Sequence, residues 1–492
     1  MSRYSFGPFT FEARARRLWR GGAELPLTVH QADVLLQLLA HPGDVLSKDA
    51  LIAAAWAGVA VTDNSLEQAI SGLRRALGDR TLIQTVPRRG YRFRGEVARS
   101  ESRTSDAALA ALLDPHREWV EGRSALETLE IDAVLRAESA LAAVVSRAPD
   151  YAPGHAALAN ACLMHFESTR ADELPDADAL LRADHHAREA TRLDPQYAEG
   201  WAALAMVLHR SGLGVQAIAA ARRAVMLEPG NWRHHFRLAY VGWGEERLRA
   251  VEHTLALFPR FALAHWLAAT VHVARQALDA AERELRAAAA AQDVPRNAHR
   301  FSSVGAHWLL GLVRLARGDE DEALAQLRQE LEEAPAGSGP PGATGGHIYG
   351  RECAANTWYA IGAVMLRQGQ RADAARAFAA ALERLPAHVL AMAGLGLAQD
   401  PSAARDALQA RLEHRLAQLA EAGLAVDAAM GRAAVMAGAG GAEDAAPLLD
   451  EALASAGPGS AGWLIPVDPL LNVPAREAAF AQVLARLRTR AG

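Results

Sequence analysis

Short amphipathic patterns fill the first hundred residues of the chain. Aromatic side chains recur over residues 4–11 in the alternation of a half-buried strand. Two further β-prone runs, residues 14–20 and 24–27, flank the dipeptide Gly21-Gly22, which is typical of a tight hairpin turn. The N-terminus is therefore predicted to be β-structure.

Two helices are predicted after these strands. Thr28, followed three residues later by Gln31, forms a capping box at the start of the first helix. Ser47 can cap the second helix through its hydroxyl. The apolar residues that we expect to face inward are Val34, Leu35, Leu38, Leu39, Leu51, Ile52 and Trp56.

A third helix is predicted over residues 63–77, after a loop at residues 57–62. Its apolar residues, Leu66, Ile70, Leu73 and Leu77, form one stripe. The opposite face carries side chains that can hydrogen-bond base edges, namely Asn64, Gln68, Ser71 and Arg75. Arg74 lies on the flank, where it can reach a phosphate. Taken alone, this pattern also describes an ordinary amphipathic helix with a polar outer face.

A β-hairpin is predicted next, over residues 83–94. Its two arms surround a turn that carries Arg88 and Arg89, with Arg92 and Arg94 nearby. Positive charge at the tip of such a hairpin can enter a DNA minor groove. The hairpin therefore favours a DNA-binding role for the helix before it.

These segments together resemble the OmpR/PhoB-type winged helix-turn-helix domain, over about a fifth of the chain. The stretches that carry the resemblance are LPLTVHQADVLLQLLAHPGDVLSKDALIAAAW, DNSLEQAISGLRRAL and LIQTVPRRGYRF, and the LRRAL and TVPRRGYRF segments are most similar to the CadC/ToxR-like branch. The resemblance implies that helix 63–77 lies in the major groove and hairpin 83–94 acts as the wing. The predicted DNA contacts are Asn64, Ser65, Gln68, Ser71, Arg74, Arg75, Arg88 and Arg89.

The resemblance carries further expectations about partners and control. It implies that the loop at residues 57–62 can contact RNA polymerase, and that a homodimer can form on tandem DNA half-sites. The family's phosphorylation-receiving domain and the transmembrane helix of the CadC/ToxR-like branch are not recognised in this sequence. We therefore expect neither phosphotransfer nor direct membrane sensing to control the protein.

The rest of the chain has a helical repeat. Prolines 115 and 149 lie 34 residues apart, as do prolines 195 and 229, and 34 residues is the tetratricopeptide period. The fullest match has small residues where two helices of a pair touch and large apolar residues between pairs: Trp358, Ile361, Gly362, Met365, Gly369, Ala374, Phe378, Ala381 and Pro386. This part of the chain thus resembles tetratricopeptide repeats.

Three segments are predicted to depart from the repeat pattern. An acidic, solvated insertion is expected near residues 165–177, a flexible loop at 336–350, and a terminal cap at 463–488. Such arrays form curved solenoids whose concave face binds peptides or protein segments. The candidate partner contacts are Trp201, His209, Trp232, His235 and Trp266, although packing between helices is an alternative role for each of them.

Charge separates the two parts of the chain. The net charge of −5 is the balance of +5 in residues 1–100 and −10 in the remainder. A small basic domain suggests a polyanion partner. Residues 99–106 are polar and aperiodic, which is typical of a linker. We therefore predict three parts, a DNA-binding domain over residues 1–98, the linker over 99–106, and a repeat domain with its cap over 107–492.

Composition argues against several chemistries. Lys48 is the only lysine, so no phosphate-loop or Schiff-base lysine can lie beyond it. Cys162 and Cys353 imply neither a disulfide framework nor a cysteine zinc site, which suits a reducing cytoplasm. No uncharged apolar stretch reaches 18 residues, so no membrane span is expected. We expect no enzymatic activity, no cofactor and no metal.

The sequence thus predicts a mostly α protein, in which an N-terminal α+β winged helix-turn-helix domain precedes an all-α tetratricopeptide-type solenoid. The predicted function is transcriptional regulation in the cytoplasm, through double-stranded DNA and a protein, peptide or effector bound by the solenoid. The alternative is a tetratricopeptide scaffold or adaptor whose DNA binding is incidental or lost.

Overall fold

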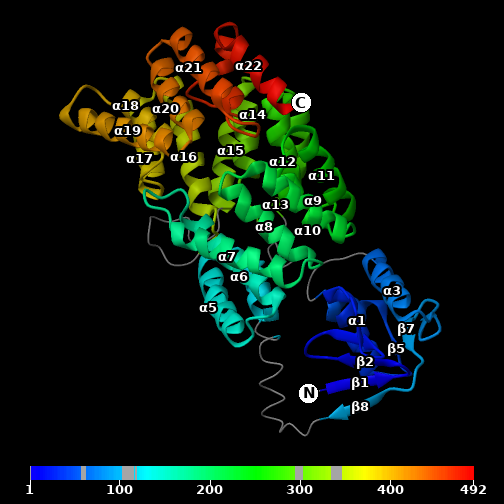
Figure 1. Cartoon of the computed structure of the whole chain (residues 1–492). Coiled ribbons are helices and arrows are strands. Elements are labelled where there is room, and N and C mark those ends of the chain that lie inside the picture. Colours follow the sequence, from blue (N-terminus) through cyan, green and yellow to red (C-terminus); the bar gives the residue numbers. More distant parts are fainter. Residues whose placement is uncertain (1, 57–62, 102–115, 117–118, 294–302, 334–345) are drawn as a thin grey trace.

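The computed structural model describes residues 2–56, 63–101, 116, 119–293, 303–333 and 346–492. The described residues form a small N-terminal unit of strands and three helices, called the head, and a larger all-helical unit, called the body (Figure 1). The mostly α fold class predicted from the sequence is confirmed. None of the described helices combines the length and the apolar character needed to cross a membrane.

The head contains two antiparallel sheets. The larger has the strand order β4-β3-β2-β1-β8 and the smaller the order β5-β7-β6. Strand β8 pairs with β1, so the sheet extends into residues 99–101, which we expected to belong to the linker. The strands are β1 (Ser2–Phe6), β2 (Phe9–Glu12), β3 (Arg17–Arg20), β4 (Ala23–Leu25), β5 (Val45–Leu46), β6 (Ile83–Val86), β7 (Gly90–Phe93) and β8 (Ala98–Glu101).

The aromatic run at residues 4–11 is two strands, and the prediction of a single strand was wrong. Gly7 has a φ of 52° and turns the chain, so that Tyr4 pairs with Phe11 and Phe6 with Phe9. All four aromatic side chains are buried on one face of the resulting hairpin. The hairpin expected at Gly21-Gly22 is confirmed by the pairing of β3 with β4.

The three head helices follow the sequence patterns. Helix α1 (Val29–Ala40) has the capping box of Thr28 and Gln31, and α2 (Lys48–Ala55) is capped by the hydroxyl of Ser47. Helix α3 (Asp63–Leu77) has the predicted bounds. Its apolar stripe packs in the head core together with α1 and the aromatic side chains of the sheet: Leu66, Ile70, Leu73 and Leu77.

The body is an array of helix pairs with short connections. Consecutive helices pack against each other from α6 to α17, as the repeat period predicts. The helices are α5 (Ile131–Arg147), α6 (Ala152–Thr169), α7 (Ala177–Leu193), α8 (Ala198–Arg210), α9 (Gly214–Leu227), α10 (Trp232–Val241), α11 (Gly244–Leu257), α12 (Ala262–Ala274), α13 (Leu278–Gln292), α14 (Ala306–Ala316), α15 (Glu320–Glu333), α16 (Gly350–Arg367), α17 (Arg371–Arg384), α18 (Val389–Ala398), α19 (Ala403–Glu421), α20 (Ala425–Gly438), α21 (Ala442–Ser455), η2 (Ile465–Val467), η3 (Val473–Arg476) and α22 (Glu477–Ala491).

Small residues allow the paired helices to approach closely, as predicted for α16 and α17. A Cβ added to Gly362 would lie 2.9 Å from the ring of Phe378, and one added to Gly394 would lie 2.4 Å from it. Phe378 is fully buried between these two glycines. Any larger residue at Gly362 or Gly394 would have to displace this ring.

Two later segments of the body pack on earlier repeats. At the C-terminus, the side chain of Arg275 donates to the carbonyl of Ala491, which places α22 against α11 and α12. Earlier in the chain, the amide of Ile348 donates to the carbonyl of Leu129 over 2.8 Å. Ile348 is buried in the core of the first repeats, so residues 346–350 are not the loose end of a loop, and that part of the prediction was wrong. Residues 336–345 of the predicted loop include none that the structure describes.

The acidic insertion is exposed over residues 173–175, as predicted, but two of its carboxylates also make ion pairs. Asp172 pairs with Arg351 and Glu173 with Arg411, so both carboxylates reach across to the second half of the body. Asp176 caps the start of α7 by accepting from the amide of Ala179. The insertion therefore connects distant parts of the array.

Candidate nucleic-acid interface

The outer face of α3 is polar and accessible. Asn64, Gln68, Ser71 and Arg75 are exposed, as the stripe on the opposite face requires, and Ser65 is half-buried. Four adjacent turns thus present amide, hydroxyl and guanidinium groups, which are the groups that read base edges. The sequence predicted this face residue by residue, because it follows from helical periodicity alone.

Arg74, predicted to reach a phosphate, is hydrogen-bonded to the wing in the structure. Its guanidinium bonds the carbonyl of Ile83 at 3.0 and 2.6 Å and the hydroxyl of Thr85 at 2.8 Å. Both acceptors belong to strand β6 of the wing. Arg74 therefore fixes the angle between α3 and the wing, and its donors are largely used within the head.

The wing presents two arginines at its tip. Arg88 and Arg89 are both exposed in the turn between β6 and β7. Arg88 has a φ of 63° after Pro87, and the amide of Arg89 donates to the carbonyl of Val86 over 3.0 Å, which is the geometry of a tight turn. Behind the tip, Arg92 donates across the hairpin to Gln84. The tip is thus held by backbone and side-chain hydrogen bonds.

Close packing holds the wing on the rest of the head. Gly90 begins β7 with a φ of 129°, and a Cβ there would lie 1.9 Å from the carbonyl oxygen of Leu46. Only glycine allows the two backbones to approach this closely. The position of the wing next to α3 therefore depends on this residue.

A shallow basic hollow lies between α3 and the wing. It is lined by Arg74, Arg80 and Arg94, with Thr81, Ile83, Gln84 and Thr85 between them. Sequence reasoning did not assign Arg80 to this surface, because it lies in the turn after α3 and belongs to no periodic pattern. Lys48, at the start of α2, pairs instead with Glu67 of α3 at 2.9 Å. The accessible charge beside α3 is therefore supplied by arginine.

Two of the predicted partner contacts in the body have a structural role. The indole nitrogen of Trp201 donates to the carbonyl of Pro195 over 3.0 Å. The ring of His235 donates to the carbonyl of Pro229 over 2.8 Å. His155 makes the same contact with Pro149. In each case the aromatic nitrogen lies six residues after the proline, a spacing that the sequence shows.

Three further candidates differ in accessibility. Trp232 is buried, where it packs against Phe258 and Phe261 and so offers no surface to a partner. His209 is half-buried against Tyr240, and burial lowers its pKa to about 4. Trp266 is half-buried against Trp463 of the C-terminal segment. His235, like Trp232, is buried.

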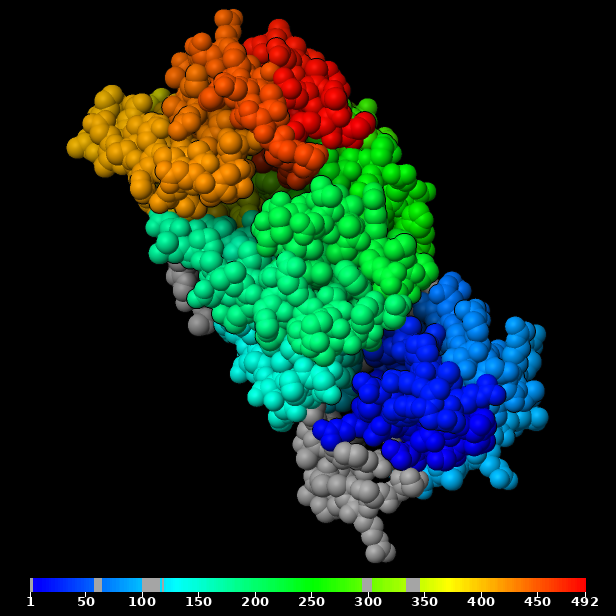
Figure 2. All heavy atoms as spheres, in the orientation of Figure 1, coloured from blue at the N-terminus to red at the C-terminus, as the bar shows by residue number. Residues whose placement is uncertain are grey.

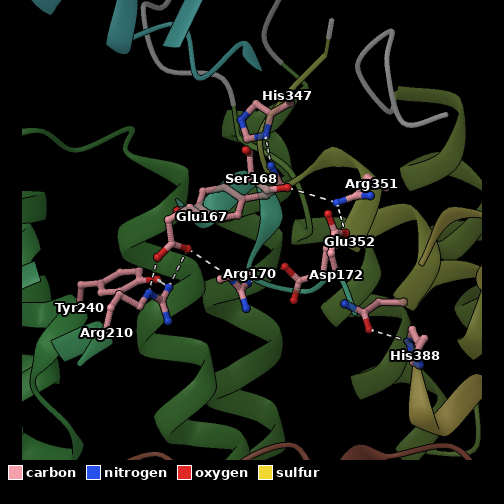
Figure 3. Close-up of polar contacts among 12 residues, drawn as sticks. Glu167, Ser168, Arg170, Asp172, Arg210, Tyr240, His347, Arg351, Glu352 and His388 are labelled. Atoms are coloured by element: carbon pink, nitrogen blue, oxygen red, sulfur yellow. Dashed lines mark hydrogen bonds and ion pairs between the residues drawn. The ribbon is translucent and has the colours of Figure 1, made fainter. Parts of the chain in front are cut away.

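Ion pairs cross the interior of the body (Figure 3). Arg170, at the end of α6, bonds Glu167 of its own helix and Glu352 of α16. Beside it, Arg210 bonds both Glu167 and the hydroxyl of Tyr240. Early repeats are thereby joined to α16.

The described residues include no group of three or more histidine, cysteine, aspartate or glutamate side chains placed to hold a metal ion. Cys162 is buried, and burial raises the pKa of its thiol to about 12. Buried His307 pairs with Asp293 and Gln326, and buried His388 with Asn356.

Comparisons with known proteins agree with this geometry. Residues 22–93 match the family described as transcriptional regulatory protein, C terminal. The cholera toxin homolog transcriptional activator of Vibrio parahaemolyticus is 34% identical over 116 residues, which cover 22% of this chain and 40% of that protein. The transcriptional activator CadC of Escherichia coli is 40% identical over 79 residues, or 15% of each chain. This chain thus spans less than half the length of either relative.

A solved structure is also similar to part of this chain. The DNA-binding domain of Escherichia coli CadC is 32% identical, covers 20% of this chain and 96% of that chain, and has a TM-score of 0.19. The helix pairs of the body recur at the tetratricopeptide spacing. The N-terminal unit is thus an OmpR/PhoB-type winged helix-turn-helix domain of the transcriptional regulatory protein family, and it is followed by a tetratricopeptide-type helical solenoid.

Proposed function

We propose that the protein regulates transcription by binding double-stranded DNA through the head. The observation that carries the proposal is the exposed polar face of α3, which Arg74 ties to a wing with two exposed arginines at its tip. In this arrangement α3 enters the major groove, where Asn64, Gln68 and Arg75 can bond base edges. The tip of the wing lies along the minor groove, where its guanidinium groups meet a negative potential.

The body is proposed to receive the signal that controls the head, as a bound protein, peptide or effector. Solenoids of this type present extended surfaces to partners. Since Trp232 and His235 are buried, Trp201, His209 and Trp266 are the candidates that keep part of their surface. Contact with RNA polymerase through residues 57–62, which lie outside the described part of the chain, and dimerisation on DNA remain proposals of the same kind.

We propose no enzymatic role, since both relatives are named as transcriptional activators. Binding of the full chain to duplex DNA, measured by fluorescence anisotropy over a range of salt concentrations, tests the proposal. The affinity should fall steeply with salt, because arginines that neutralise phosphates release counterions. Binding no tighter than that of an Arg75→Ala, Arg88→Ala, Arg89→Ala variant would instead support a scaffold whose DNA binding is lost.

A further inference from the structure

The head lies against the first repeats of the body (Figure 2). At the start of α1, Val29 packs against an apolar cluster of the body that includes Tyr197 and Leu193. Beside it, the guanidinium of Arg16 lies 5.6 Å from the centre of the Tyr151 ring and pairs with Asp33 of α1 at 2.6 Å. The interface is therefore apolar at its centre, with charged side chains around it.

His30 is the charged residue that joins the two units directly. Its Nε2 lies 2.7 Å from a carboxylate oxygen of Glu228, which follows α9 of the body. Its Nδ1 lies 2.8 Å from the carbonyl oxygen of Ala55, the last residue of α2. The ring also stacks on Trp56 with a centroid distance of 4.8 Å. The imidazole thus connects the body to the end of the helix that precedes the recognition helix.

The two hydrogen bonds require the charged form of His30. A carbonyl oxygen and an ionised carboxylate only accept hydrogen bonds, so both ring nitrogens must donate. Glu228 is ionised here, because its other oxygen accepts from Asn231 and from His234. Although burial opposes it, His30 and His234 hold the pKa of this carboxyl well below its ordinary value. A neutral His30 could keep only one of its two bonds.

The charged groups around His30 also favour its protonated form. Three carboxylates face it, from Glu228 after α9, from Asp194 after α7 and from Asp33 on α1. The guanidinium of Arg16 is engaged with Asp33, and the ring of His234 bonds Glu228. Although burial alone would lower it, the Glu228 carboxylate raises the pKa of His30 above the ordinary value of 6.5.

We propose that protonated His30 is a latch that docks the head on the body, and that loss of its proton releases the head. This inference rests on the proposed function, in which the body controls the head. Undocking removes the Glu228 carboxylate, the main cause of the raised pKa of His30, and so returns this pKa towards its ordinary value. Because docking raises that pKa, docking is at full strength below about pH 6.5. The docking constant then falls tenfold for each pH unit until the docked histidine has also lost its proton.

Energy transfer between two dyes on the full chain measures docking. The dyes are attached at Glu24→Cys in the head and Glu252→Cys in the body, both at exposed positions. The native thiols of Cys162 and Cys353 have raised pKa values and react slowly. The docked fraction is followed from pH 6 to pH 9 at constant ionic strength.

A comparison of three chains distinguishes the effect of His30 from a general effect of pH on docking. The unsubstituted chain should lose docking as the pH rises. His30→Gln, whose neutral amide cannot carry the positive charge of the protonated ring, should dock at least tenfold more weakly at pH 6 and show no pH dependence. His41→Gln changes an exposed histidine at the other end of α1 and should behave as the unsubstituted chain. A docked fraction that is independent of pH, or His30→Gln docking as well as His41→Gln, overturns the latch.

The same samples are tested for duplex DNA binding. DNA binding without any pH-dependent change in docking would refute the latch but support the proposed function. A pH-dependent change in docking in a chain that never binds DNA would support the latch but refute the proposed function.

Discussion

The substitution Arg74→Ala tests whether Arg74 positions the wing or contacts DNA itself. The guanidinium of Arg74 donates three times to two acceptors on β6, so its loss leaves the carbonyl of Ile83 and the hydroxyl of Thr85 without these donors. Hydrogen bonds from charged groups contribute about 1.5–3 kcal/mol each when shielded from water. Because this site is partly exposed, we expect a total loss of about 1–2 kcal/mol.

The matched control is Arg75→Ala, which removes an exposed guanidinium on the outer face of the same helix. Hydrogen exchange of α3 and β6 in the full chain measures the first effect. Exchange should become about 5–30-fold faster in Arg74→Ala and stay unchanged in Arg75→Ala. The affinity for DNA measures the second effect. Arg75→Ala should weaken binding by about 1–3 kcal/mol, because its guanidinium bonds a base edge, and Arg74→Ala should leave the salt slope of binding nearly constant. The opposite pattern would refute the positioning role of Arg74.

Three further predictions address the wing, the body and its pH dependence. Replacing Arg88 and Arg89 with alanine should weaken DNA binding and lower the salt slope by about 2, with an unchanged melting temperature; an unchanged slope would place the tip away from DNA. Phe378→Ala should destabilise the body by about 3–5 kcal/mol in urea unfolding, because the side chain is fully buried between two helices, and a loss below 1 kcal/mol would contradict that packing. Burial raises the pKa of Asp468 to about 6, so the stability of the body should decline as the pH rises from 4 to 7. Asp468→Asn should make the stability less dependent on pH. The same dependence of stability on pH in both proteins would contradict the role of Asp468.

Local patterns were sufficient to predict most of the head. The capping box at Thr28, the stripe from Leu66 to Leu77 and the bounds of α3 depend on residues within one or two turns of each other. The single strand over residues 4–11 was wrong although the sequence held the signal. Phe6 and Phe9 are three positions apart, and a strand that alternates its side chains cannot keep both on one face without a turn.

Contacts between distant residues could not be predicted. The hydrogen bond from Ile348 to Leu129 joins positions more than two hundred residues apart, and no periodic pattern in the sequence predicts it. The pair His30 and Glu228 is of the same kind, because each residue taken alone is an ordinary polar side chain near a helix end. Arg74 shows a further limit, since helical periodicity places its Cα on the flank but does not decide whether the side chain reaches DNA or the wing.

Selection of bound sequences from a random pool of duplex DNA by the full chain tests the central claim most directly. If α3 reads base edges, the bound pool should converge on a recurrent motif, and Gln68→Ala should change the preferred base at one position within it, at a cost of about 1–3 kcal/mol. A pool that shows no motif, or that is the same for the full chain and for a chain with alanine at Gln68, Arg75 and Arg89, would contradict the assignment of α3 as the DNA-reading helix.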